Sequence, residues 1–254
     1  MDMKENNMLK FAKANAKLAE LEKLIGKKVY SLSLLAGISC PCANECLSKV
    51  IIVKNKRKIE DGPNTKYRCF SASQEALFPK VYDSRKHNFD LLRSKKTVKE
   101  LVELINSSIP KDAEVIRIHV SGDFYSQIYF DAWLKVCELN PKINFYAYTK
   151  SLPFVIKRLT VIPKNLVLTA SRGGKRDDLI DKYKLIEATV IYHPDEAKGR
   201  DIDHNDFLAF NSKNRKSYTL LIHGSQPSNS DAAKAISKLK ANGIKFSYNR
   251  KNSV

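Results

Sequence analysis

Apolar positions in the second half of the chain fall into two alternating kinds of segment. Short runs such as EVIRIHVSGD (114–123) and INFYAYTKS (143–151) are typical of β-strands, and the stretches after them have helical spacing. The same order continues through three further predicted strands, at 165–174, 188–194 and 217–227. Strands that alternate with helix-length connections predict βαβ units and a parallel sheet.

The first half of the chain adds one strand and several helices. Apolar residues at near-helical spacing predict a helix over 4–25 within an N-terminal helical region, 1–26, which Gly26 can end. KKVYSLSLLAG (27–37) predicts the first strand of the sheet. Weaker patterns predict helices at 71–80 and 96–107, a β-like run at 50–55 and a turn at 60–64. No domain boundary is visible, so all 254 residues are expected to form one domain.

Polar and apolar side chains alternate along these predicted strands. In 114–123 one face carries Ile116, Ile118 and Val120, and the opposite face carries Arg117, His119 and Ser121. A parallel sheet covered on both faces normally has nearly continuous apolar strands. The alternation therefore predicts a partial or open TIM-like (βα) barrel of about six or more parallel strands, whose polar interior holds water and a ligand.

Polar residues also gather at the carboxyl ends of the predicted strands, where α/β folds keep their functional sites. The candidate catalytic residues at these ends are His119, Asp123, Lys150, Arg172, His193 and His223. Lys150 and Arg172 suit a phosphate or a carboxylate. The sequence thus predicts a small polar or anionic substrate at this mouth.

Three of the five cysteines stand within seven positions, in GISCPCANEC, directly after the first predicted strand. The N-terminus has no apolar core typical of a secretory signal, so a reducing compartment is expected, and disulfides are disfavoured there. Zinc is disfavoured because the spacing from Cys40 to Cys42 is tight for a knuckle. Cys40, Cys46 and Cys69 suit a [4Fe-4S] cluster in a segment spanning 37–70. Cys42 is either the fourth ligand or a bystander that leaves one iron open.

The remaining features concern partners and location. The formal net charge of +18, from 45 Lys+Arg against 27 Asp+Glu, makes nucleic acid a candidate partner. No stretch approaches the roughly 20 apolar residues of a membrane span, so no membrane association is expected. The polar excursion at 195–216 carries His204 between Asp203 and Asp206, and a solvated loop is the favoured interpretation over a lid or a metal site.

Several of these motifs together resemble the gene product eighty-eight family of bacteriophage proteins. The resemblance covers most of residues 28–230 and rests on SLSLLAGISCPCANECLSK, YRCFSASQEALFP, RIHVSGDFYSQIYFDAWL, YAYTKSLPF, LTASRGG and LLIHGSQP. It implies a phage-encoded protein made in the host cell cytoplasm. Cys40, Cys46 and Cys69 match cysteines of that family, whereas Cys42 occupies the position of a family glycine.

The predicted architecture also resembles the radical S-adenosylmethionine superfamily, in which three cysteines after the first barrel strand hold a cluster with an open iron. Ser121, Gly122 and Asp123 resemble its Gly-Gly-Glu motif, which contacts S-adenosylmethionine, and Ser171 is a further candidate cofactor-binding residue. The Cys-x₃-Cys-x₂-Cys spacing of that superfamily is absent here. The resemblance implies radical chemistry, and an open iron acting as a Lewis acid in hydrolysis or elimination is a second route. The alternatives are a non-catalytic cluster protein that binds nucleic acid or a host protein, and a zinc-stabilised module.

Overall fold

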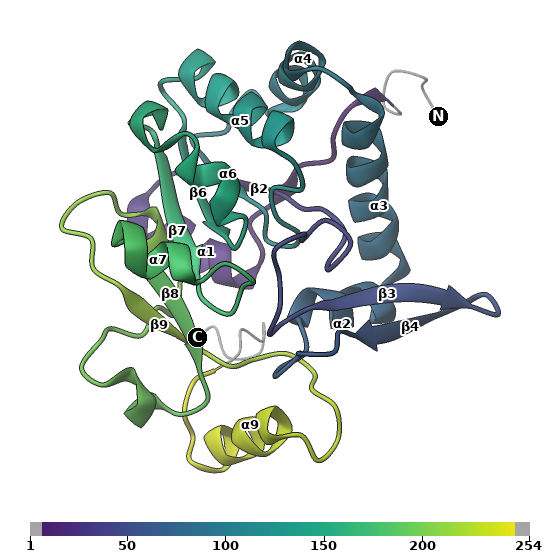
Figure 1. Cartoon of the computed structure of the whole chain (residues 1–254), viewed down its shortest axis with the longest axis vertical. Helices are drawn as coiled ribbons and strands as arrows, with labels where there is room; N and C mark the ends of the chain where they lie inside the picture. The colour runs from purple at the N-terminus through teal and green to yellow at the C-terminus, as the bar shows by residue number, and fades with distance from the viewer. Residues whose placement is uncertain (1–6, 247–254) are drawn as a thin grey trace.

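The predicted parallel sheet is present, and it does not close on itself. In this computed structural model, which describes residues 7–246, six strands run parallel and the short β1 pairs antiparallel at one edge. Across the sheet the strands follow the order β1 (Ala12–Lys13), β2 (Val29–Leu32), β5 (Val115–Ile118), β6 (Asn144–Thr149), β7 (Leu166–Ser171), β8 (Glu187–Ile191) and β9 (Tyr218–Leu221) (Figure 1). The α/β class is therefore confirmed, whereas a TIM-like barrel is not.

Helices precede the first parallel strand, fill the connections between the parallel strands and follow the last one. They are α1 (Ala16–Ile25), α2 (Phe70–Leu77), α3 (Pro79–Ser94), α4 (Val98–Ser108), α5 (Gln127–Leu139), α6 (Leu152–Ile156), α7 (Asp178–Tyr183), α8 (Phe207–Phe210) and α9 (Asp231–Ala241), with 3₁₀ turns η2 (Leu159–Val161) and η3 (Pro194–Ala197). A separate antiparallel hairpin, β3 (Ser48–Val53) and β4 (Lys56–Asp61), is inserted between β2 and α2. It projects from the body of the molecule (Figure 1).

The N-terminal helix is shorter than the sequence pattern predicts. α1 begins at Ala16 because the side chain of Asn15 accepts a hydrogen bond from the backbone N–H of Leu18 at 3.0 Å and caps the first turn. Ahead of this cap the chain forms β1, and residues 1–6 of the predicted N-terminal helical region lie outside the described residues. The predicted end is correct, since Gly26 is left-handed and closes the helix.

The predicted helix at 71–80 is divided in two. α2 ends at Leu77 because Phe78 precedes Pro79, and a residue before proline is pushed into the extended region, here at φ −114° and ψ 102°. Pro79 then begins α3, since its fixed φ suits the first turn of a helix. This break separates the short helix that carries Glu75 from the long helix that carries Arg85.

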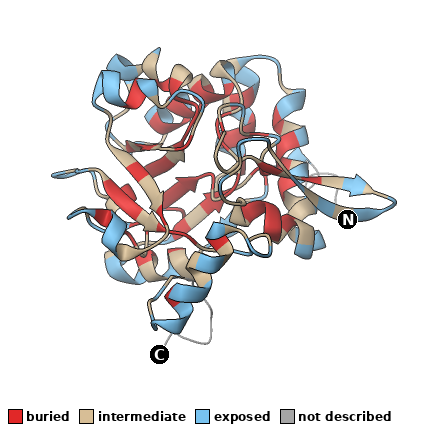
Figure 2. Ribbon diagram, turned by 60° about the horizontal axis from the view of Figure 1, so that its bottom comes forward, coloured by how far each residue is buried: buried red, intermediate tan, exposed pale blue. Residues whose placement is uncertain are grey.

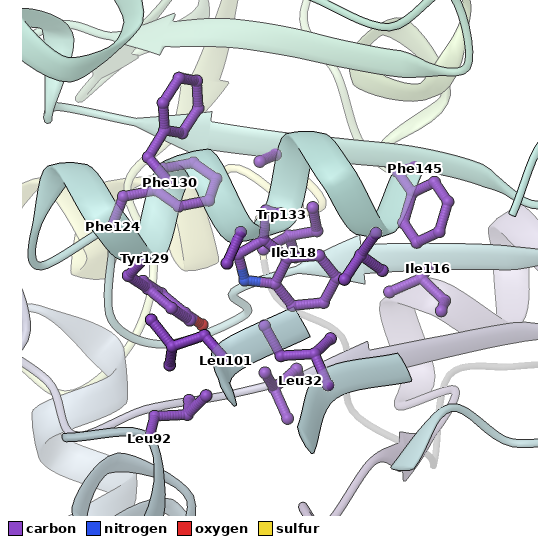
Figure 3. Packing of buried hydrophobic residues seen from close by; sticks show 14 of the residues in the cluster. Leu32, Leu92, Leu101, Ile116, Ile118, Phe124, Tyr129, Phe130, Trp133 and Phe145 are labelled. Atoms are coloured by element: carbon purple, nitrogen blue, oxygen red, sulfur yellow. The ribbon is translucent and has the colours of Figure 1, made fainter. Parts of the chain in front are cut away.

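One face of the sheet packs against α3, α4 and α5. Trp133 of α5 lies between Leu101 of α4 and the strand residues Ile116 and Ile118, and all four side chains are fully buried (Figure 3). Figure 2 shows the same distribution across the molecule, with buried residues on the central strands and exposed residues on the outer helices and the hairpin tip. This apolar layer is the predicted one, and its burial is the main driving force for the fold.

The opposite face of the sheet corrects the prediction of a water-filled polar interior. Leu18 and Leu21 of α1 and Ala209 of α8 form a buried cluster there with Tyr146 and Tyr218 of the sheet. The segment at 195–216, interpreted from the sequence as a solvated loop, supplies α8 and thus covers β6 and β7. The sheet is therefore covered by protein on both faces.

Several of the polar groups on this covered face share one carboxylate as their partner. Asp206 is fully buried, forms ion pairs with Arg117 and with Lys17 (2.6 Å), and accepts hydrogen bonds from the hydroxyls of Tyr146 (3.1 Å) and Tyr148 (3.3 Å). Burial alone would raise the pKa of Asp206, but the charges of Arg117 and Lys17 outweigh it and lower that pKa to about 2. The side chains expected to line a ligand cavity thus anchor a covering segment.

Candidate functional site

The cysteine segment after β2 folds into a series of tight turns. The N–H of Ser39 donates to the carbonyl of Leu35 (3.2 Å), that of Cys40 to Gly37 (3.2 Å), and that of Ala43 to Cys40 (3.2 Å). Gly37 has a φ of +70°, and a Cβ there would collide with the carbonyl oxygen of Ser48. Glycine is thus required at this position for the segment to fold back against the start of β3.

This segment lies across the carboxyl ends of two sheet strands. After β5, Gly122 has a φ of +88°, and a Cβ there would stand 2.5 Å from the hydroxyl oxygen of Ser39. After β7, the carbonyl of Gly173 accepts from the N–H of Glu45 (2.9 Å), and the carbonyl of Cys42 accepts from the N–H of Lys175 (2.9 Å). The cysteine segment is therefore held at the edge where the candidate site residues were predicted.

Cys69 reaches the same place from the other side of the β3–β4 hairpin. It precedes the first residue of α2, and its N–H donates to the hydroxyl of Ser48 at 3.3 Å. Gln226, after β9, holds the preceding residue, because it accepts from the N–H of Arg68 (2.7 Å) and donates to its carbonyl (3.0 Å). Contacts distant in the sequence therefore fix the position of Cys69.

Three of the cysteine thiols interact with one another. Burial raises the pKa of the Cys40 thiol well above its usual value, and the neighbouring Asp123, Cys69 and Cys46 raise it further. Burial also raises the pKa of Cys46 to about 11, although the charge of Lys150 opposes this. Cys40, Cys46 and Cys69 are half-buried and form no disulfide. They make up what we call the thiol group.

Cys42 stands apart from this group. Its pKa is raised first by burial and then by Asp123, whereas Lys175 and a hydrogen bond with Ser151 lower it. The strongest influences on its pKa thus include Lys175 and Ser151, which are not among the strongest at Cys40 or Cys46.

Within residues 7–246 there is no set of three or more His, Cys, Asp or Glu side chains arranged to hold a metal ion. The three thiols therefore lie near one another, but their side chains are not already arranged as the ligands of a metal ion. Their donor chemistry nevertheless fits iron–sulfur ligation, because thiolates are the ligands of such clusters and Lys150 supplies a positive charge beside them. The raised pKa values of Cys40 and Cys46 mean that metal binding would have to displace their protons.

Asp123 and Lys150 lie at the thiol group, and both are fully engaged in hydrogen bonds. The Asp123 carboxylate accepts from the hydroxyl of Thr149 (2.6 Å) and from the N–H groups of Lys150 (2.8 Å) and Phe124 (2.7 Å). The Lys150 ammonium donates to the hydroxyl of Ser171 (2.8 Å) and to the carbonyls of Ser171 (3.0 Å) and Arg172 (2.7 Å). The two residues thus tie the ends of β5, β6 and β7 together.

Ser121 points toward Glu75 of α2, a residue that the sequence analysis missed. The Ser121 hydroxyl donates to Glu75 Oε1 (3.2 Å), which also accepts from the N–H of Ala36 (3.0 Å) and from Arg85 (3.0 Å). Glu75 and Arg85 are both buried. In the sequence, Glu75 and Arg85 are two charged residues within amphipathic helical stretches. Such a pattern does not show that the two side chains form a buried ion pair.

The other predicted catalytic residues lie in different surroundings. Arg172 forms ion pairs with Glu187 and with Asp181 (2.7 Å), and His193 contacts Asp195 (3.0 Å) at the start of η3. The ring centroid of His223 lies 4.8 Å from that of Phe70, the neighbour of Cys69. The backbone carbonyl of Arg172 accepts from Lys150 at the same edge of the sheet, but its guanidinium is engaged by Glu187 and Asp181.

His119 faces the apolar core instead of the mouth. Its φ of +68° turns the chain out of the strand, and its Nε2 lies 2.9 Å from the hydroxyl of Tyr129. Burial, assisted by the charge of Arg117, lowers the pKa of His119 to about 3. The polar alternation predicted along 114–123 therefore stops at Ile118, where β5 ends.

The His119 pKa predicts an acid-sensitive fold. The unfolded chain binds a proton below about pH 6.5 and the folded chain does not, so stability should fall between about pH 6.5 and 3, by about 1.4 kcal/mol per unit. His119→Asn should remove this part of the pH dependence, since asparagine tolerates a positive φ. Urea unfolding of both proteins at several pH values measures the effect, and parallel pH profiles would contradict it.

A cavity of about 460 Å³ lies elsewhere, beside β7. Its apolar lining includes Leu152 and Val155 of α6 and Leu166 and Leu168 of β7, and none of its lining residues is a cysteine. The prediction of a ligand cavity at the cysteine mouth therefore gains no support from it.

Comparisons with known proteins show which proteins are related to this chain. Over 122 residues the chain is 30% identical to the Gene 88 protein of Mycobacterium phage L5 and 29% identical to that of Mycobacterium phage D29. Each match covers 45% of this chain, and 44% and 43% of the two relatives, so the chain spans less than half the length of these relatives. No solved structure matches it, and no comparison supports the radical S-adenosylmethionine resemblance.

Two further findings bear on the predictions. In the described part of the chain no helix is both long and apolar enough to cross a bilayer. The family model described as Gene product 88 matches residues 6–241, which is most of the sequence and includes every candidate site residue. The chain therefore belongs to the gene product 88 family of phage proteins.

Proposed function

We propose that the thiol group of this phage protein holds a [4Fe-4S] cluster in the host cell cytoplasm, and that the cluster serves an enzyme acting on a polar or anionic substrate. The observation that carries the proposal is the convergence of Cys40, Cys46 and Cys69. These residues come from two segments separated by a hairpin, and contacts from the ends of β5, β7 and β9 hold them at one edge of the sheet.

The surroundings of the thiols support cluster chemistry over a structural zinc site. Three interacting thiols with Cys42 outside the group would leave one metal position without a cysteine ligand. A cluster bound in this way supplies an open iron that can act as a Lewis acid or pass an electron to a bound molecule. A structural zinc site, in contrast, is normally closed by four protein ligands.

The chain's own residues have two roles in this proposal. Lys150 supports thiolate formation at Cys46, since its ammonium lowers the pKa of that thiol against the effect of burial. His223 keeps Nδ1 at 3.1 Å from the carbonyl of Leu221 beside Phe70, and burial lowers the pKa of His223. A neutral imidazole near the cysteines is suited to exchange a proton with a substrate.

The test is anaerobic purification and reconstitution, followed by iron and sulfide analysis and electron paramagnetic resonance. Cys40→Ala, Cys46→Ala and Cys69→Ala should each lose most of the bound iron and sulfide. Cys42→Ala should retain both, and Cys137→Ala is the matched control because Cys137 is buried in α5. Zinc in place of iron, or full cluster content in the three variants, would contradict the proposal.

The reduced protein also allows a test of S-adenosylmethionine as a cofactor. If it binds at the open iron, adding it should change the resonance spectrum, and the cofactor should be cleaved. An unchanged spectrum without cleavage would exclude this cofactor and leave the Lewis-acid role. Ser121 and Ser171 hydrogen-bond to Glu75 and Lys150, so neither hydroxyl is free to bind it without rearrangement.

A further inference from the structure

The β3–β4 hairpin is a projecting two-stranded ribbon, defined here as residues 48–61. Its strands pair from Ser48 with Asp61 to Val53 with Lys56. Lys54 and Asn55 form the turn at φ values of +48° and +59°, the positive values of a type I′ turn that matches the twist of a hairpin. The ribbon extends beyond α2, well clear of the central sheet (Figure 1).

The two faces of the ribbon differ. Residues directly opposite each other share a face, so Val50 and Ile59 belong to the face that packs toward α2, where Arg57 donates to the carbonyl of Ala76 (3.3 Å). The other face carries Ile51 opposite Lys58 and Val53 opposite Lys56, together with the pair formed by Lys49 and Glu60. Lys54, Lys56 and Lys58 are all exposed.

The outer part of the ribbon carries positive charges and no negative ones. Residues 50–59 read VIIVKNKRKI, which contains four cations and no acidic residue. The two acids at the base are compensated locally, because Glu60 pairs with Lys49 (2.7 Å) and Asp61 pairs with Arg68 (2.5 Å). The outer part of the ribbon therefore presents positive charge without a balancing carboxylate from its own sequence.

We propose that this ribbon binds double-stranded DNA, with Lys54, Lys56 and Lys58 contacting phosphates. A two-stranded ribbon fits the major groove of B-DNA, about 12 Å wide, and lysines supply most of the affinity by displacing counterions. Ile51 and Val53 lie on the same face and can contact thymine methyl groups. The net charge of +18 would speed the encounter with DNA.

This proposal goes beyond the proposed cluster function and does not depend on it. The base of the ribbon lies between Cys46 and Cys69 in the sequence, whereas the three lysines lie toward its outer end. None of the three lysines belongs to the residues that position the cysteines. Failure of DNA binding would therefore leave the cluster proposal intact, and failure of cluster binding would leave this one intact.

The test compares two triple variants of equal charge. The variant Lys54→Gln/Lys56→Gln/Lys58→Gln alters the ribbon, and Lys234→Gln/Lys238→Gln/Lys240→Gln removes three exposed lysines from α9. Fluorescence anisotropy with a 20-base-pair duplex, at several salt concentrations, measures affinity and salt dependence. Circular dichroism melting curves and iron content should be unchanged in both variants.

We expect the ribbon variant to bind at least about tenfold more weakly at 0.1 M salt, with its log–log salt slope reduced by about 3. The α9 variant should remain close to the wild type. Equal losses in both variants would show binding through general charge and overturn the proposal. So would absent duplex binding, a preference for single strands, or tighter binding to a polyglutamate probe than to the duplex.

Discussion

Replacing Asp206 with asparagine should destabilise the folded protein by about 3–5 kcal/mol, because it removes the carboxylate that pairs with the buried Arg117 on the covered face of the sheet. Asp206 is fully buried, and its carboxylate is the ion-pair partner of both Lys17 and Arg117. The cost of removing one member of a buried ion pair is large, since the remaining charges keep their desolvation penalty. Urea unfolding of the variant and the wild type measures the difference.

A nearby exposed aspartate gives the matched control. Asp201 lies in the same segment, and Asp201→Asn should change the free energy of unfolding by less than about 0.5 kcal/mol. The pH dependence is a second readout. The folded-state pKa of Asp206 is depressed to about 2 from 3.8, so its stabilisation is present above about pH 4 and is lost as the pH falls through 2. A loss below about 1 kcal/mol in Asp206→Asn would contradict the structural role.

The order of strands and helices was accessible from the sequence because it depends on local periodicity. Ile116 and Ile118 lie on the predicted apolar face and are buried, and they belong to a run whose spacing alone indicates a strand. β4 was missed because its residues are mostly charged and because only pairing with β3 stabilises it as a strand. The hairpin is therefore a product of tertiary context rather than of intrinsic propensity.

The function of the polar strand face could not be predicted in the same way. Arg117, Tyr146 and Tyr148 alternate with apolar residues as a ligand-lined barrel would require, yet their partner is Asp206, which lies far along the chain. The periodicity of the sequence shows that one strand face is polar. It does not show which distant segment supplies the hydrogen-bond and ion-pair partners of that face. The direction of the His119 side chain was also not predictable from the alternation. The positive φ of His119 ends the strand and turns its side chain toward the core.

At the candidate site, the set of Cys40, Cys46 and Cys69 was already expected from the sequence, but the contacts that place Cys69 were not. Cys69 and Cys46 both raise the pKa of Cys40 in the structure. The position of Cys69 depends on Ser48 of β3 and on Gln226 after β9, which binds the preceding residue. Local sequence patterns do not reveal such contacts between distant segments.

Glu75→Gln should destabilise the protein by about 3–5 kcal/mol and also loosen the cysteine segment. The buried carboxylate accepts hydrogen bonds from Ala36, Arg85 and Ser121, and thus joins α3 to the loops after β2 and β5. Burial raises the pKa of Glu75 and lowers that of Arg85, although the attraction between them opposes both shifts. The pair therefore adds little net stability, whereas losing one member exposes the full desolvation cost of the other.

A double-mutant cycle separates the two effects of Glu75. Arg85→Met alone should cost about as much as Glu75→Gln, and Glu75→Leu/Arg85→Met should recover much of the stability because no buried charge remains. The double variant still lacks the acceptor for the N–H of Ala36, which directly precedes the Gly37 turn of the cysteine segment. It should therefore be stable in urea and yet retain less iron after reconstitution than the wild type. Stability and iron content that rise and fall together across all the variants would show that Glu75 acts only on the fold.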